Sequence, residues 1–208
     1  MVFFKGNQLK FFGDSGNLIF TTREYAHYLG IGISSASRQL YQLKKSKTLL
    51  LITRNIWANP SLPEFSPLLA VPHLLGKAQG YVSFLTTLSM YGVISQIPQV
   101  YQVATVTHTR TLETPIGIFE FHQLKSSFMR YGVLWSKGYR IAEPEKALVD
   151  TIYLSMRKKK RFSSLPELNL DRSLVKKKMV EQYIQMITPM PLRIAVQKRI
   201  KVLFSQYR

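Results

Sequence analysis

Four prolines in one short stretch most constrain how this chain can fold. Pro60, Pro63, Pro67 and Pro72 fall within thirteen residues. Each proline removes a backbone N–H donor and disfavours helix at the residue before it. Residues 60–72 are therefore predicted to form a linker or an extended connecting arm. The segments before and after this stretch are expected to form separate parts of the fold.

A first short helix is predicted in the segment before the prolines. Residues 19–20 are apolar and favour a short strand, and Thr21 or Thr22 then offers a hydroxyl that can cap a helix. Gly30 is expected to end this helix, because glycine readily takes the left-handed conformation of a helix C-terminus. Its inner face would carry Tyr25, Ala26 and Leu29.

A second helix follows after a short turn at residues 30–33. Ser34 is the predicted N-cap, and the helix is expected to run over residues 34–45. Ala36, Leu40 and Leu43 recur at helical spacing and should face the core. The remaining faces carry the candidate DNA-binding residues of this helix: Ser34, Ser35, Ser37, Arg38, Tyr41, Gln42, Lys44 and Lys45.

A β-hairpin is predicted directly after the second helix. Residues 49–53 and 56–58 are β-prone and are separated by Arg54 and Asn55. Helix, tight turn, helix and basic hairpin in this order are typical of a winged helix-turn-helix, whose second helix enters the major groove of DNA. Arg54 would then lie on the adjacent backbone or minor groove. The alternative is a winged helix that contacts only protein.

The charge of the chain is concentrated at its two ends. The net charge is +18, with lysine and arginine outnumbering acidic residues by 8 to 2 in residues 1–59 and by 14 to 3 in residues 154–208. Residues 60–153 are nearly neutral, with 7 basic and 6 acidic residues. Two basic surfaces suit a protein that neutralises phosphates. The alternative is that these basic faces serve only solubility.

Composition excludes several classes of protein. A 46% apolar share indicates a folded chain, and a length of 208 residues is typical of one or two domains. The apolar runs are too short to span a bilayer, no basic segment has a strong aromatic apolar face, and no signal peptide is present, so the protein is expected to be cytoplasmic with no membrane partner. The absence of cysteine excludes disulfides, thiolate zinc sites and cysteine nucleophiles.

The middle of the chain carries mixed signals for helix and strand. A helix is predicted at residues 81–91, ended by Gly92, and strands at residues 100–107, 116–121 and 138–141. A further helix is predicted to start at residues 143–150. Pro144 suits its first turn, Glu143 and Glu145 favour the positive end of its dipole, and Lys146 can pair with Asp150 one turn on.

These segments together resemble the AbiEi family. The resemblance covers roughly residues 15–155 and is carried by the winged-helix pattern, the run Gly80-Tyr81-Val82-Ser83-Phe84-Leu85-Thr86-Thr87-Leu88-Ser89-Met90-Tyr91-Gly92 and the run Ile141-Ala142-Glu143-Pro144-Glu145-Lys146-Ala147-Leu148-Val149-Asp150. The chain departs from the family at the hairpin, where members usually have a glycine and a tyrosine and this chain has Arg54-Asn55-Ile56-Trp57-Ala58.

The resemblance implies an antitoxin and autorepressor of a bacterial type IV toxin-antitoxin, or abortive-infection, system. Its winged helix would bind inverted repeats in its own promoter, where two copies could form a dimer on the DNA. The following domain would counteract a toxin that resembles a nucleotidyltransferase. Direct contact with that toxin is left open. The alternatives are a winged-helix transcription factor without a toxin partner and, as a weaker one, a metal-dependent nuclease.

The C-terminal part is predicted to be helical and basic. Helices are expected over residues 171–187 and 192–207, with Pro189 and Pro191 between them, and their apolar residues should dock on the body or on another copy. A second phosphate-binding surface is predicted there, and the alternative is an acidic partner or RNA. Its candidate residues are Lys158, Lys159, Lys160, Lys176, Lys177 and Lys178.

No enzyme activity, cofactor or metal is predicted. Glu143, Glu145 and Asp150 are the carboxylates that a metal-dependent nuclease would use, but helix-start preferences explain the two glutamates. The four histidines, His27, His73, His108 and His122, lack metal-ligand spacing. The predicted fold class is α+β. Its parts are a winged helix-turn-helix at residues 1–59, a linker at 60–72, a mixed α/β antitoxin-like domain at 73–156 and a basic helical tail at 157–208.

Overall fold

The computed structural model of the chain describes residues 6–157 and 169–205. Within these residues the fold is α+β, with eight α-helices, a three-stranded antiparallel sheet and a six-stranded mixed sheet. The α+β class predicted from the sequence is confirmed. The chain divides into two compact units, Met1–Gly76 with Leu112–Ile118 and Lys77–Thr111 with Phe119–Arg208.

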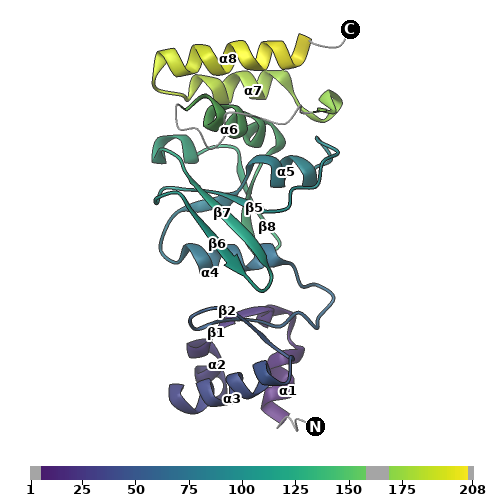
Figure 1. The fold of residues 1–208 in the computed structure, drawn as a ribbon, viewed down its shortest axis with the longest axis vertical. Helices are drawn as coiled ribbons and strands as arrows, with labels where there is room; N and C mark the ends of the chain where they lie inside the picture. The colour runs from purple at the N-terminus through teal and green to yellow at the C-terminus, as the bar shows by residue number, and fades with distance from the viewer. Residues whose placement is uncertain (1–5, 158–168, 206–208) are drawn as a thin grey trace. The chain divides into compact units, whose positions relative to one another are not determined.

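The first unit places a small sheet on one side of α2 and α3 (Figure 1). The strand order is β1-β3-β2, and the register pairs Phe20 with Trp57 and Leu51 with Trp57. The elements in chain order are α1 (Gly6–Gly13), β1 (Ile19–Thr21), α2 (Thr22–Leu29), α3 (Ile33–Lys45), β2 (Leu50–Thr53), β3 (Ile56–Ala58), a 3-10 helix (Pro67–Ala70) and α4 (Val71–Leu75).

The ends of α2 are fixed by local chemistry. The Thr21 side chain accepts from the backbone of Glu24, and the Glu24 carboxylate accepts from the backbone of Thr21, which makes a capping box. Gly30 ends the helix with φ of 64°, in the left-handed region. Both ends are as the sequence predicts.

The start of α3 differs from the prediction. The N-cap is Gly32, without a side-chain hydrogen bond, and the helix begins at Ile33, so the prediction of Ser34 as N-cap is wrong. Ser34 lies inside the first turn, where its side chain is exposed. The predicted core face is confirmed, because the buried residues of α3 are Ala36, Leu40 and Leu43.

One apolar cluster holds the first unit together. Tyr25 and Trp57 are its largest buried side chains, and the Trp57 indole donates to the Thr22 hydroxyl at 2.9 Å. Phe11 packs edge-on against Phe20 with ring centroids 5.0 Å apart. The cluster consists of Phe11, Phe20, Tyr25, Ala26, Ala36, Leu40, Leu43, Leu49 and Trp57.

The proline stretch carries two short helices. Pro67 stands in the first turn of the 3-10 helix and Pro72 in the first turn of α4. Helix N-termini tolerate proline because the missing N–H has no partner within the helix.

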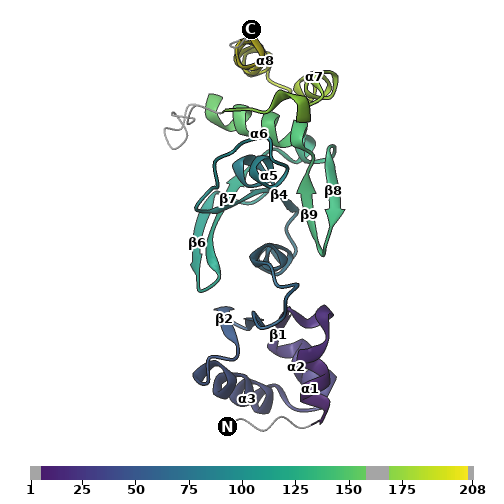
Figure 2. The same ribbon diagram turned by 90° about the vertical axis from the view of Figure 1, so that its right-hand side faces the viewer.

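The second unit is built on the six-stranded sheet, in the order β6-β7-β5-β4-β9-β8 (Figure 2). Strand β4 pairs antiparallel with β5 and parallel with β9. The elements are β4 (Gly80–Val82), α5 (Phe84–Met90), β5 (Tyr101–Thr105), β6 (Arg110–Thr114), β7 (Gly117–Gln123), a 3-10 helix (Ser126–Met129), β8 (Val133–Ser136), β9 (Tyr139–Ala142), α6 (Pro144–Met156), a 3-10 helix (Arg172–Leu174), α7 (Lys177–Gln185) and α8 (Met190–Ser205).

The helix predicted at residues 81–91 is partly wrong. Tyr81 and Val82 lie in β4, and α5 begins only at Phe84. The positive φ of Phe84, 58°, turns the backbone sharply between the strand and the helix. Gln102 holds this turn from both sides, because its carbonyl accepts from the N–H of Ser83 and its side-chain oxygen accepts from the N–H of Leu85, both at 3.0 Å. Such a strained residue persists only where its surroundings fix it.

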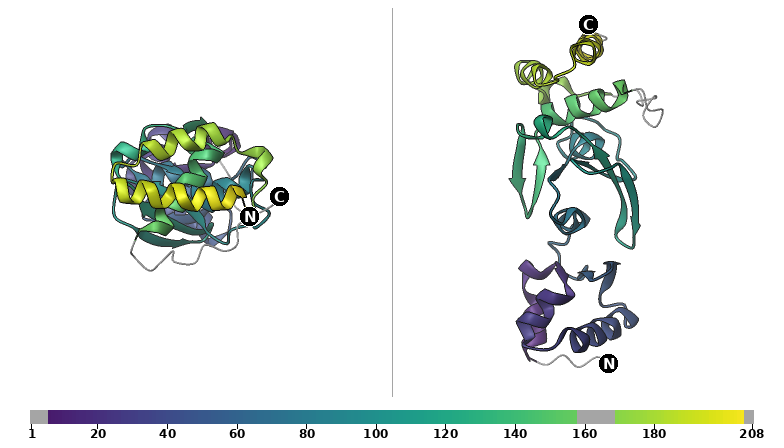
Figure 3. Two further views of the ribbon diagram at one scale, coloured as in Figure 1. Left: turned by 90° about the horizontal axis from the view of Figure 1, so that it is seen from above. Right: turned by 90° about the vertical axis from the view of Figure 1, so that its left-hand side faces the viewer.

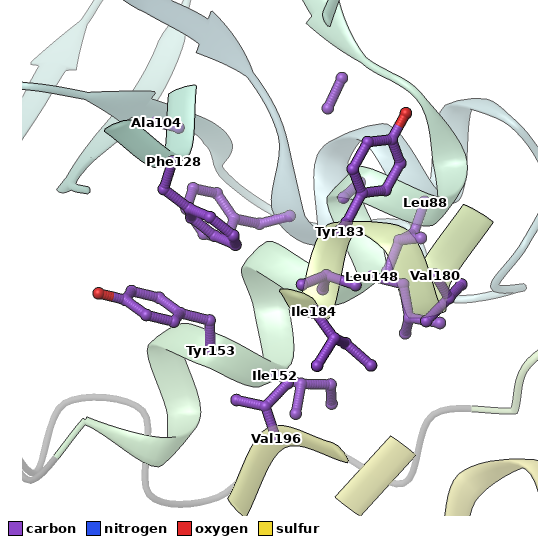
Figure 4. Close-up of a cluster of buried hydrophobic side chains, with 14 of the residues drawn as sticks. Leu88, Ala104, Phe128, Leu148, Ile152, Tyr153, Val180, Tyr183, Ile184 and Val196 are labelled. Carbon is purple, nitrogen blue, oxygen red and sulfur yellow. The ribbon is translucent and has the colours of Figure 1, made fainter. Parts of the chain in front are cut away.

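The three last helices share one core. Helices α7 and α8 lie side by side and both pack on α6 (Figure 3). Figure 4 shows Leu148 and Ile152 of α6 beside Ile184 of α7 and Val196 of α8. The expectation that the C-terminal helices dock on the body is therefore met by α6.

The helix predicted over residues 171–187 begins later than expected. Asp171 caps only a 3-10 helix, Arg172–Leu174, and Val175 is extended with φ of −127° and ψ of 115°. Helix α7 starts at Lys177, so Lys176 is its N-cap. In the described part of the chain, no helix is both long enough and apolar enough to cross a bilayer.

Candidate nucleic-acid interface

The outer face of α3 gathers most of the residues predicted to bind DNA. The inner residues Ala36 and Leu40 are fully buried, so the orientation of the helix is fixed by the core. Ser35 and Ser37 are half-buried. The exposed members of the predicted set on α3 are Ser34, Arg38, Tyr41, Gln42, Lys44 and Lys45.

A shallow hollow marks the centre of this face. It is lined by Ser35, Arg38, Gln39 and Gln42. Three of these four residues were singled out from the sequence, and Gln39 was missed. The hollow offers hydroxyl, guanidinium and amide groups, and α3 contains no acidic residue. This combination suits hydrogen bonding to base edges and phosphates.

Gln39 is held by a hydrogen-bonded triangle. Its side-chain oxygen accepts from the Tyr25 hydroxyl at 2.9 Å and from the Gln8 amide at 3.0 Å, and Gln8 also donates to the Tyr25 hydroxyl at 3.0 Å. Burial raises the pKa of Tyr25, which keeps this hydroxyl protonated as a donor. These partners are 14 to 31 residues apart along the chain, so local sequence patterns do not reveal them.

Tyr41 has two side-chain contacts despite its exposure. Its ring meets Trp57 edge-on, with centroids 5.3 Å apart and an interplanar angle of 88°. The Lys44 ammonium lies 5.8 Å from the centroid of the Tyr41 ring. The aromatic ring is therefore held in place before any ligand binds.

An antiparallel hairpin of β2 and β3 lies where the sequence predicts the wing. Arg54 and Asn55 form its turn, both are exposed, and Asn55 has φ of 66°, a conformation that asparagine tolerates well. The Asn55 carbonyl accepts from the N–H of Thr22 at 3.0 Å, which fixes the turn at the start of α2. Arg54 does not line the hollow on α3.

The predicted second phosphate-binding residues fall into two groups. Lys176, Lys177 and Lys178 are exposed at the start of α7. Lys158, Lys159 and Lys160 lie outside the described residues.

The sequence run behind the family resemblance forms a buried ion pair. Lys146 and Asp150 are both fully buried in α6, and the Lys146 ammonium binds the Asp150 carboxylate. That carboxylate also accepts from Ser83 at 2.8 Å and from Tyr81 at 3.0 Å. Burial lowers the pKa of Lys146 and raises that of Asp150, and each partner opposes the other's shift. The network ties α6 to β4 and to the start of α5.

A glycine makes this packing possible. A Cβ added at Gly132 would lie 2.8 Å from the Cβ of Lys146 and 2.7 Å from the Tyr183 ring. Gly132 also has φ of 69°, which disfavours a side chain at this position. The close approach places the backbone of the loop before β8 against α6.

The carboxylates considered for a nuclease are occupied within the protein. Glu143 accepts from the Tyr183 hydroxyl, and Glu145 accepts from the N–H of Lys176 at 2.9 Å. Asp150 is shared among Lys146, Tyr81 and Ser83, as described above. Across residues 6–157 and 169–205, no three His, Asp or Glu side chains are placed to hold a metal ion.

No family model matches the chain, and no curated protein matches it. The function of the chain is therefore inferred from its sequence pattern and from the geometry of α3 and the β2–β3 hairpin.

Proposed function

We propose that the first unit is a winged helix-turn-helix that binds double-stranded DNA. Helix α3 is the recognition helix and the β2–β3 hairpin is the wing. One observation carries the proposal: the inner face of α3 is sealed in the core, while its outer face presents hydrogen-bond donors and cations without an acidic residue. A helix of this kind fits the major groove.

The proposed contacts follow from side-chain chemistry. Arg38 and Gln42 face outward from the hollow on α3, and their planar guanidinium and amide groups suit guanine and adenine edges respectively. Lys44, Lys45 and Arg54 would contact phosphates or the minor groove and set the position of the helix. The exposed lysines at the start of α7 would supply a second phosphate-binding surface.

More specifically, we propose a DNA-binding antitoxin and transcriptional autorepressor of a type IV toxin-antitoxin system. The resemblance carried by residues 80–92 and 141–150 supports this assignment. The protein would bind inverted repeats in its own promoter as two copies, because a twofold operator matches a twofold dimer. Its functional partner would be a nucleotidyltransferase-like toxin encoded beside it.

DNA binding is tested by titrating the full chain into labelled duplex DNA from the region upstream of its own reading frame. A duplex of scrambled sequence is the control. We expect the upstream duplex to bind at least about 10³-fold more tightly, with log K falling linearly with log salt. Lys45→Ala should weaken binding to both duplexes alike and reduce the slope of log K against log salt by about one. Equal affinity for both duplexes would reject the autorepressor.

The antitoxin role needs a separate test. Co-expression of the chain with the neighbouring reading frame should restore growth that the neighbour alone arrests. A variant that has lost DNA binding but keeps its fold, such as Arg38→Ala with Lys45→Ala, separates repression from neutralisation. If no toxic neighbour exists, the transcription factor without a toxin partner becomes the better assignment.

A further inference from the structure

A groove runs between the two C-terminal helices of the second unit. Helices α7 and α8 lie side by side on α6 (Figure 3), and the groove opens between them. Its volume is about 150 Å³. The lining comes from both helices, with apolar side chains at its floor and charged side chains at its edges.

The floor of the groove is apolar and already ordered. Val180, Ile184 and Ile200 are buried in the core shared with α6, so that core sets their positions. Phe204 adds an aromatic surface at the wall. An apolar cavity of about 150 Å³ is known to accommodate a benzene ring. The size of the groove therefore fits one ring or a short branched chain.

The charges at the groove select the second part of the ligand. Lys177 comes from α7 and Lys201 from α8, and within the described ranges neither ammonium takes part in an ion pair. Glu181 is the single carboxylate of the lining, so two cations stand against one anion. The lining thus favours one anionic group and disfavours a second one.

We propose that this groove binds a small aromatic or branched apolar molecule that carries one anionic group. The apolar part lies over Val180, Ile184 and Ile200, and the anionic group lies between Lys177 and Lys201. The proposal concerns the second unit alone and does not depend on DNA binding by the first.

Benzoate and its neutral analogue benzamide test the proposal. Each is titrated into the full chain carrying labelled isoleucine methyl groups, at low salt, while the methyl signals are followed by NMR. We expect benzoate to shift the signals of Ile184 and Ile200 and to bind at least fivefold more tightly than benzamide. Equal binding of the two probes, or shifts confined to other isoleucines, would overturn the proposal.

Three variants locate the binding. Lys201→Met should weaken the binding of benzoate about fivefold and leave the binding of benzamide unchanged, because only the charge of the side chain is lost. Lys198→Met removes an exposed charge of α8 that does not line the groove. This variant should bind both probes as the parent chain does. Gln197 lines the groove, so Gln197→Phe should fill it and abolish the binding of both probes. Methyl spectra recorded without a probe check that each variant is folded. If Lys198→Met weakens benzoate binding as much as Lys201→Met does, the affinity reflects the general positive charge of α8 and the proposal is overturned.

Discussion

Helices α3 and α6 have the same length of thirteen residues but are used in opposite ways. Helix α3 buries three side chains and leaves its outer face to solvent. Helix α6 buries nine consecutive residues, Glu145–Tyr153, on every side. The most recognisable run of the sequence therefore builds a core, whereas the candidate site lies on a helix that has no distinctive motif.

The largest effect is expected from breaking the buried pair of α6. Lys146→Met leaves the Asp150 carboxylate buried without its cation, which should lower the free energy of unfolding of the second unit by about 3–5 kcal/mol. Urea unfolding followed by near-ultraviolet circular dichroism measures the loss. Lys146→Met combined with Asp150→Leu should recover a large part of it. A single variant that loses under about 1 kcal/mol would show that the pair behaves like a surface ion pair.

The inner face of α3 should respond almost as strongly. Leu40→Ala removes a fully buried side chain from the first core and should cost about 2–5 kcal/mol, because a cavity remains. Gln42→Ala is the matched change on the outer face and should alter stability by less than about 0.5 kcal/mol. Hydrogen exchange of the backbone amides reports on this unit separately. Similar losses in both variants would contradict the two-faced character of α3.

A smaller effect, on affinity and not stability, is expected at Arg38. Arg38→Ala should cost about 1–3 kcal/mol of binding to the preferred duplex and relax base preference, with unfolding unchanged. Titrations against duplexes changed one base pair at a time measure the preference. Unaltered discrimination at every position would show that α3 does not read bases.

The smallest effect is expected at the start of α2. Thr21→Ala removes one half of the capping box and should destabilise the first unit by about 1 kcal/mol. Thr21→Ser keeps the hydroxyl and is the control, and thermal unfolding of both variants makes the measurement. An equal loss in Thr21→Ser would assign the effect to the methyl group.

Local chemistry explains which elements were predictable. Thr21, Gly30 and the Arg54–Asn55 turn act through neighbouring residues, so the ends of α2 and the hairpin follow from the sequence. The spacing of Ala36, Leu40 and Leu43 likewise fixes the orientation of α3. The wrong N-cap at Ser34 arose because a serine hydroxyl was favoured over Gly32, which caps through its backbone conformation alone.

The errors in the second unit have a different cause. Tyr81 and Val82 belong to a strand buried on both sides, whose apolar run cannot be told from a helix by periodicity. Strand β6 was missed because its side chains are exposed or half-buried and show no apolar alternation. The positions of Gln39 and of the buried Lys146 depend on contacts between distant segments, which local patterns do not contain.

The buried pair also bears on how such a chain can diverge. Neither Lys146 nor Asp150 can be replaced alone without leaving a charge in the core, and Gly132 leaves no room for a side chain beside them. Changes at these positions must therefore arise together, which is rare in descent by single substitutions. The exposed residues of α3 do not contact this pair and can be exchanged one at a time. Distant descendants of one ancestor would then share the interior of the second unit long after the outer face of α3 has changed.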